Sequence, residues 1–269
     1  MKNNALFNTK YLDKSKQLVN IIGAIDQDSI VNATVFNMTS NIVNDFYNIN
    51  LLNNDTGIYL VKTSIRPLLQ KIANLKYLLT YTLDGQVNLE YNIAFYNVWH
   101  LQNNAYGLLC KLNRDEFNAL WGPLSYEFYE AFDENIIRPH RDSYYTSSST
   151  HKGQWYKGLG STAKNEVEFM ADVFSDVFIE PDFEIFGFIY KYYSTYVHGG
   201  IVIYDQMHVY NKIDYSVIQL LICALYTLFN LIYTMLVPYN NEFKKILNNM
   251  TQLMNDEIDY YKVQSNKAK

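Results

Sequence analysis

The sequence predicts an all-α protein, a single-domain helical bundle with a central apolar helix, and two patterns carry that prediction. Apolar residues recur every three or four positions over much of the chain, which is the spacing of one helix face. Residues 215–241 contain no charged side chain, as expected of a helix that other helices surround. The chain has 269 residues, of which 49% are hydrophobic, so it can bury one large core. We therefore expect one domain over residues 1–269, with its core at about 10–262.

Helical periodicity is clearest in two neighbouring segments. The first segment places these apolar residues on one face: Val31, Val35, Met38, Ile42, Phe46 and Ile49. The second, residues 55–82, does the same with Val61, Ile65, Leu68, Leu69, Ile72, Leu75, Leu78 and Leu79. Pro67 interrupts it and either kinks one helix or begins a fresh one. Asp84 and Gly85 then predict a turn.

The middle of the chain is less regular. Residues 87–96 fit the alternation of a strand and the spacing of a helix, and the helical neighbours favour a helix. Residues 114–135 are expected to form another helix, broken or kinked at Gly122-Pro123. Residues 138–160 are rich in serine and glycine and predict a long surface loop, which is either functional or disordered.

Helical patterns return after this loop. Ser161 and Thr162 are candidate N-caps for a helix that buries Val167, Met170, Phe174, Val177 and Phe178. The next helix is expected to begin near Pro181 and to end at Gly199-Gly200. Its inward positions are predicted to be Phe183, Phe186, Tyr190, Tyr193 and Val197. The apolar helix from residue 215 should stop at Pro238, and a last, polar helix should run to about Tyr261.

Residues 215–237 also pass a test for a membrane span, which needs roughly 20 apolar residues. Polar side chains such as Gln219 and Asn230 are spread along the segment, and no basic cluster flanks it. A buried core helix is therefore favoured, and a membrane helix remains the alternative. The first residues lack the apolar core of a signal peptide, and the two cysteines do not form a disulfide framework. We expect a cytoplasmic protein.

Charge and motifs narrow the function classes. The net charge is −5 and no run of lysine or arginine stands out, so the chain has no strong DNA-binding signature. The five histidines lack the spacing of metal ligands, and no glycine-rich phosphate loop is present. We therefore expect neither a metal nor a cofactor.

The best candidate for a functional residue is His198, which is expected to be the last residue of its helix. Gly187, Lys191, Ser194 and His198 fall on one stripe at the edge of the buried face. A histidine there suits proton transfer, because its pKa ordinarily lies near neutrality, and Ser194 could hydrogen-bond to it from one turn earlier. The competing interpretation is that His198 caps the helix and binds a neighbouring loop.

Arg66 is the second candidate, since it lies at the edge of an otherwise apolar helix. An arginine in such a place usually pairs with a carboxylate or faces a pocket. If Arg66 and His198 meet across helices, they would bind a phosphate or phosphodiester. A structural ion pair is the other interpretation.

Two separated motifs carry a resemblance. The run Tyr193-Ser194-Thr195-Tyr196-Val197-His198-Gly199 resembles the Ser-x-x-Val-His-Gly signature of a bacterial helical family of unknown function. Ile65-Arg66-Pro67-Leu68-Leu69-Gln70, with Leu75-Lys76-Tyr77-Leu78 after it, is similar to that family's second motif, although Gln70 stands where a glutamate is usual. The resemblance covers residues 31–237. More loosely, the chain resembles HEPN ribonucleases, whose histidine follows an arginine that is absent here, so Lys191 or Arg66 would have to replace it.

These likenesses imply a metal-independent endoribonuclease or toxin-type effector of bacterial phage defence, with catalytic residues His198, Arg66, Lys191 and Ser194. RNA would then be the partner. The alternative is a non-catalytic helical interaction or regulatory protein that binds a protein partner. The sequence leaves open whether the chain is an enzyme. A homodimer would be common for HEPN-like folds.

Overall fold

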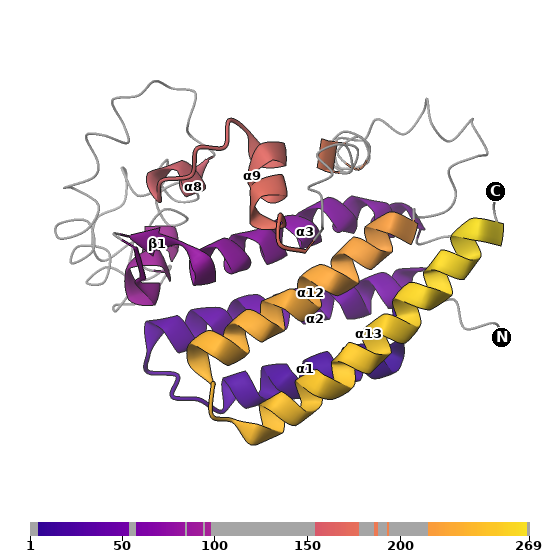
Figure 1. Cartoon of the computed structure of the whole chain (residues 1–269), viewed down its shortest axis with the longest axis horizontal. Coiled ribbons are helices and arrows are strands. Elements are labelled where there is room, and N and C mark those ends of the chain that lie inside the picture. The colour runs from indigo at the N-terminus through magenta and orange to yellow at the C-terminus, as the bar shows by residue number, and fades with distance from the viewer. Residues whose placement is uncertain are drawn as a thin grey trace, which may run out of the picture. The chain divides into compact units, whose positions relative to one another are not determined.

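The computed structural model describes residues 5–53, 58–83, 85–93, 95–97, 154–177, 186–187, 193 and 215–267. Within these residues helices dominate, and strands are confined to a hairpin of two residues on each side (Figure 1). The prediction of an all-α protein is confirmed. Residues 114–135 and 194–200, where further helical residues were expected, lie outside the described part.

The chain forms two compact units. One joins Met1–Leu79 with Met170–Lys269, and the other is Thr80–Phe169. The boundaries fall within helices α3 (Ile58–Thr80) and α9 (Glu166–Val173). One domain over residues 1–269 stays a prediction, and each unit is described by itself.

Helices α1 (Thr9–Gly23) and α2 (Ile30–Leu52) open the first unit and pack against each other. The side chain of Asn8 caps α1 by accepting the Lys10 N–H at 2.9 Å. The α2 face matches the expected stripe except at Met38, which is only half-buried. Thr39 is fully buried in its place, because its hydroxyl donates to the Val35 carbonyl and is satisfied inside the helix.

Helix α3 is continuous across Pro67, which corrects the alternative of a fresh start there. Pro67 lies on the exposed side, so its ring and its missing N–H face away from the core. The opposite side buries the predicted stripe almost completely: Val61, Ile65, Leu68, Leu69, Ile72, Leu75, Leu78 and Leu79. The apolar face therefore holds the helix together where the proline weakens it.

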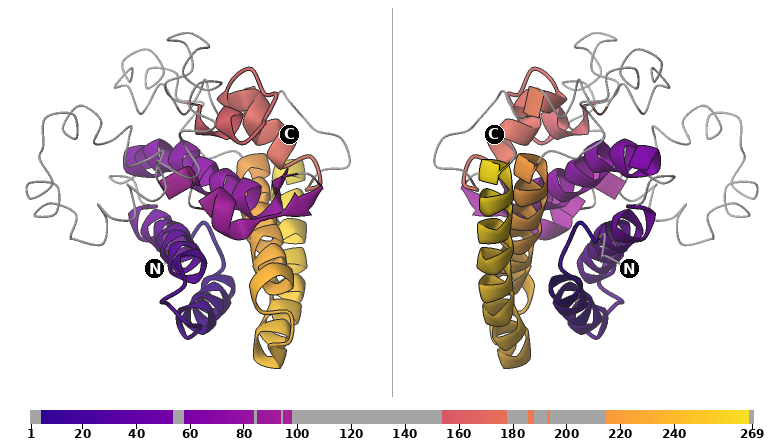
Figure 2. Two further views of the ribbon diagram at one scale, coloured as in Figure 1. Left: turned by 90° about the vertical axis from the view of Figure 1, so that its left-hand side faces the viewer. Right: turned by 90° about the vertical axis from the view of Figure 1, so that its right-hand side faces the viewer.

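Helices α12 (Tyr215–Leu236) and α13 (Asn241–Lys267) lie side by side, and α13 also packs against α1 (Figure 1, Figure 2). As predicted, α12 ends before Pro238. Helix α13 continues to Lys267, so the expected end near Tyr261 is wrong. Helix α12 is long and apolar enough over Val217–Leu236 to cross a membrane, and 56% of that window is buried. A core helix passes the same test, so both interpretations of this segment stand.

The second unit contains the hairpin of β1 (Thr82–Leu83) and β2 (Gln86–Val87). Gly85 has φ 79°, which confirms the predicted turn. Val87 thus belongs to a strand, whereas residues 89–93 and 95–97 are helical. The stretch that fitted both a strand and a helix therefore contains the end of a strand followed by helical residues. Helix α8 (Trp155–Gly158) adds one turn where the end of a loop was expected.

Aromatic packing explains why residues 155–158 are ordered in a helical turn. The Tyr156 ring stacks on the Phe169 ring, with 4.1 Å between the ring centres. The Trp155 ring packs edge-on against the Tyr96 ring, with 4.8 Å between the centres. Burial of such large rings outweighs the loop-forming tendency of the glycines nearby. The rest of the predicted loop, residues 138–153, lies outside the described part.

The start of α9 also differs from the prediction. Asn165, not Ser161 or Thr162, is its cap, since the Asn165 side-chain oxygen accepts the Val167 and Glu168 N–H groups at 2.9 and 3.0 Å. Ser161 instead accepts the Ala163 N–H at 3.3 Å, within the preceding turn. Several residues in this stretch suit a cap, so sequence alone could not select among them.

Candidate functional site

Of the four predicted site residues, the structure describes Arg66. Lys191, Ser194 and His198 lie outside the described residues, so their mutual placement stays a prediction. Arg66 is half-buried on α3, between the buried Ile65 and the exposed Pro67. Its position at the edge of the apolar face agrees with the sequence analysis.

A second cation, Lys62, lies one turn before Arg66 and was not singled out from the sequence. Side chains four positions apart share a helix face, and Lys62 is only 3% exposed. Helix α3 carries no acidic residue, although the whole chain is acidic. Of these two cations, the half-buried Arg66 is the one that an anion such as a carboxylate or a phosphate could reach. The sequence feature that could have identified Lys62 is a lysine within an apolar segment, four positions before Arg66.

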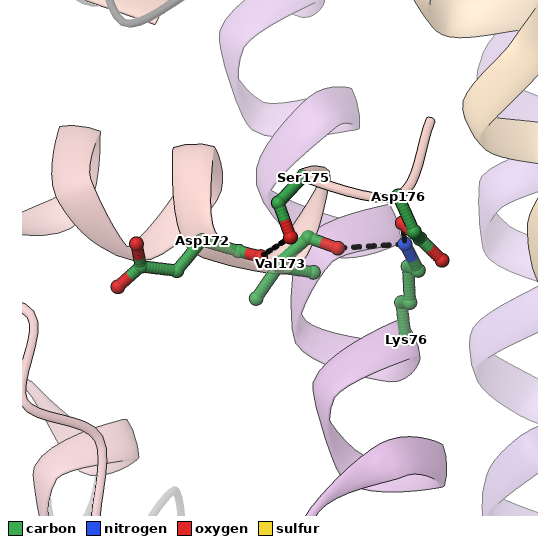
Figure 3. A network of polar contacts seen from close by, with 5 residues as sticks. All are labelled: Lys76, Asp172, Val173, Ser175 and Asp176. Carbon is green, nitrogen blue, oxygen red and sulfur yellow. Dashed lines mark hydrogen bonds and ion pairs between the residues drawn. The ribbon is translucent and has the colours of Figure 1, made fainter. Parts of the chain in front are cut away.

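Lys76 is the most deeply buried cation among the described side chains, at 2% exposure. Figure 3 shows its ammonium against the end of α9, where it donates a 2.6 Å hydrogen bond to the Val173 carbonyl and pairs with the Asp176 carboxylate. The last carbonyls of a helix lack partners within the helix and carry its negative dipole end. Lys76 thus caps the C-terminus of α9.

The environment of Lys76 opposes its charge. Burial lowers the pKa of the Lys76 ammonium below its usual value, and the adjacent Asp176 carboxylate partly restores it. Asp176 is largely exposed, so water solvates the anion while the cation is enclosed. The ion pair therefore stabilises a buried ammonium, while its carboxylate partner stays in contact with water.

Lys76 also connects α3 to the helix that is predicted to carry His198. Its Nζ lies 5.5 Å from the centre of the Phe174 ring, a cation–π distance. Phe174 in turn stacks on Phe186, with ring centres 5.8 Å apart and 7° between the planes. Phe186 and Tyr193 are fully buried, as predicted for the inward face of that helix. Helix α3 therefore carries Arg66 and also contacts this aromatic stack through Lys76.

Among the described residues, no three His, Cys, Asp or Glu side chains come together as a metal site. Cys223 is half-buried on α12 and forms no disulfide bond within the described part of the chain, and Cys110 lies outside that part. Among the predicted site residues that the structure describes, Arg66 is the candidate anion-binding group, whereas the Lys76 ammonium is already bound by the Val173 carbonyl and the Asp176 carboxylate. A guanidinium can bind an anion and stabilise charge that develops on it.

Comparisons with family models, with curated proteins and with solved structures found no match to this chain. The likenesses to the bacterial helical family and to HEPN ribonucleases accordingly remain predictions.

Proposed function

We propose that this chain is a metal-independent endoribonuclease, similar to the HEPN type, that acts as a toxin-type effector of phage defence. The observation that carries the proposal is the architecture of α3. This helix presents Arg66 at a half-buried position and, through Lys76 and Phe174, holds Phe186 of the helix expected to end at His198. A cation for phosphate and a base on an anchored helix are the two parts that such a reaction needs.

In this mechanism His198 accepts the proton of the RNA 2′-hydroxyl while that oxygen attacks phosphorus. The bond between phosphorus and the 5′-oxygen breaks, and that oxygen takes a proton from water as it leaves, so the products are a 2′,3′-cyclic phosphate and a 5′-hydroxyl. The proton held by His198 then neutralises the hydroxide that remains. Arg66 stabilises the extra negative charge on the phosphoryl oxygens, with Lys191 as the second cation. Ser194 orients His198 by a hydrogen bond. No metal ion takes part in these steps.

A second candidate function is a non-catalytic interaction or regulatory protein. Large apolar or aromatic side chains that are exposed favour it: Leu51 at 76%, Leu60 at 49%, Tyr239 at 94% and Tyr260 at 57%. Exposed aromatic residues are enriched where proteins bind one another. A homodimer or another protein would be the partner.

Expression in bacteria separates the two functions. Growth and total RNA would be compared for the wild type, His198→Ala and Arg66→Ala, with His208→Ala as a matched histidine control. We expect growth arrest and RNA cleavage with the wild type and the control, and loss of both effects in the other two variants. Circular dichroism must show that the inactive variants remain folded. Intact RNA and normal growth in every strain would favour the interaction protein.

A further inference from the structure

Glu257 is a carboxylic acid buried where the start of α1 meets the second half of α13. It is 6% exposed, and its Oε1 accepts the backbone N–H of Asn8 at 2.8 Å. Its Oε2 is buried and has no hydrogen-bond partner among the described residues. Glu257 thus adds a cap from α13 to the N-cap residue of α1, and half of its carboxyl group is left unsatisfied.

The segment that Glu257 holds is also held from the other side. The side-chain amide of Asn50 on α2 accepts the Phe7 N–H and donates to the Phe7 carbonyl, both at 2.8 Å. The Phe7 ring is buried against Phe46, with ring centres 4.7 Å apart. Residues 7 and 8 therefore join α2 to α13 at the first turn of α1. Loss of the Glu257 contact would free one side of this junction.

Among the side chains that the structure describes, the titratable groups that interact with Glu257 supply no positive charge. Tyr11 of α1 interacts electrostatically with Glu257 and, in turn, with Cys223 and Tyr226 of α12. The phenol of Tyr11 donates to the Ile222 carbonyl, and that of Tyr226 bonds the Thr251 hydroxyl at 2.7 Å. Burial raises the pKa of the Tyr11 phenol well above its ordinary value, so Tyr11 is neutral at pH 7. On α13 itself, the neighbours Asp256 and Asp259 are exposed acids.

We propose that Glu257 is a proton-controlled latch that fastens the N-terminal end of α1 to α13. The protonated carboxyl can stay buried and accept the Asn8 N–H. The ionised carboxylate leaves a charged oxygen without a partner, and water must enter between α1 and α13 to solvate it. The latch stands independently of the proposed ribonuclease activity.

The titration of Glu257 sets the pH range of this change. Burial raises the pKa of Glu257 from its ordinary 4.5 to about 7, and the Asn8 hydrogen bond only partly opposes that rise. The folded state therefore binds the proton more tightly than the unfolded state. The stabilising effect of protonation is fully present below about pH 4.5 and is lost as the pH rises through about 7. The latch closes on the acidic side of neutrality and opens on the basic side.

Hydrogen exchange of the whole chain tests the latch, with protection compared at pH 6 and pH 8.5 after correction for the intrinsic exchange rate. We expect peptides from the start of α1 and from α13 around Glu257 to lose protection on the order of tenfold in the wild type at the higher pH. Glu257→Gln keeps an acceptor for Asn8 and cannot ionise, so its protection should be the same at both values. Glu242→Gln, an exposed glutamine substitution on the same helix, should behave as the wild type.

The same comparison has a clear contrary result. Equal protection at both pH values in the wild type would overturn the latch, as would an equal loss in Glu257→Gln and the wild type. If Glu257→Gln does not fold, Glu257→Met replaces it, since methionine fills a similar volume without a titratable group. Thermal unfolding then supplies the second readout. The melting temperature of the wild type should fall between pH 6 and pH 8.5 by more than that of Glu257→Met, and equal falls would also overturn the proposal.

Discussion

At the scale of single residues, the informative groups are ionisable side chains that are buried in an apolar core. Lys76 binds the end of α9 and lies over an aromatic ring, whereas Glu257 binds the start of α1. Each of these side chains satisfies backbone groups that a helix leaves without partners at its ends. Burial of an ionisable group is costly, so each of these contacts with a helix end has to offset part of that cost.

Asp176→Asn tests the role of the Lys76 pair. The substitution leaves a buried ammonium without its anion, so we expect a loss of about 1–2 kcal/mol in the free energy of unfolding at pH 7. The effect should be much smaller in the K76M background, where the Lys76 ammonium is absent. Urea denaturation of the two single variants and the double variant measures the coupling.

Asp172→Asn is the matched control, because Asp172 is an exposed acid near the same helix end and its carboxylate points away from Lys76 (Figure 3). It should leave stability nearly unchanged. Additive losses in the double variant would show that Lys76 and Asp176 act separately, against this account.

At the scale of elements, the apolar stripes predicted α2, α3 and α12 well, because burial of one face dominates the stability of a helix. Ends were harder to predict. The cap of α9 is Asn165 and not Ser161 or Thr162 as predicted, and α13 extends beyond the predicted end near Tyr261. Capping depends on which of several suitable side chains reaches a free N–H group, and tertiary packing decides that.

Asn165→Ala tests the corrected start of α9. It removes the acceptor of two backbone N–H groups, so we expect a loss of about 1 kcal/mol in the free energy of unfolding. Thr162→Ala should have almost no effect, since Thr162 is exposed and precedes the helix. Chemical denaturation of both variants compares them directly, and a larger loss for Thr162→Ala would contradict the assignment.

At the scale of the whole molecule, the first unit combines the beginning and the end of the chain. Helical periodicity identifies which face of a helix is buried but not which partner covers it. The contact of Glu257 with Asn8, far apart in sequence, could therefore not be foreseen, and neither could the contact of Lys76 with Val173. The half-buried position of Arg66 could be predicted, because the sequence shows a charged residue at the edge of an apolar stripe.

Cleavage of RNA by the purified chain in the presence of a metal chelator tests the central claim most directly. We expect the wild type to cleave, and His198→Ala and Arg66→Ala each to be slower by at least about a hundredfold while they remain folded. His208→Ala should retain the wild-type rate. RNA that stays intact with the wild type, or is cleaved equally fast by His198→Ala, would contradict the proposed ribonuclease.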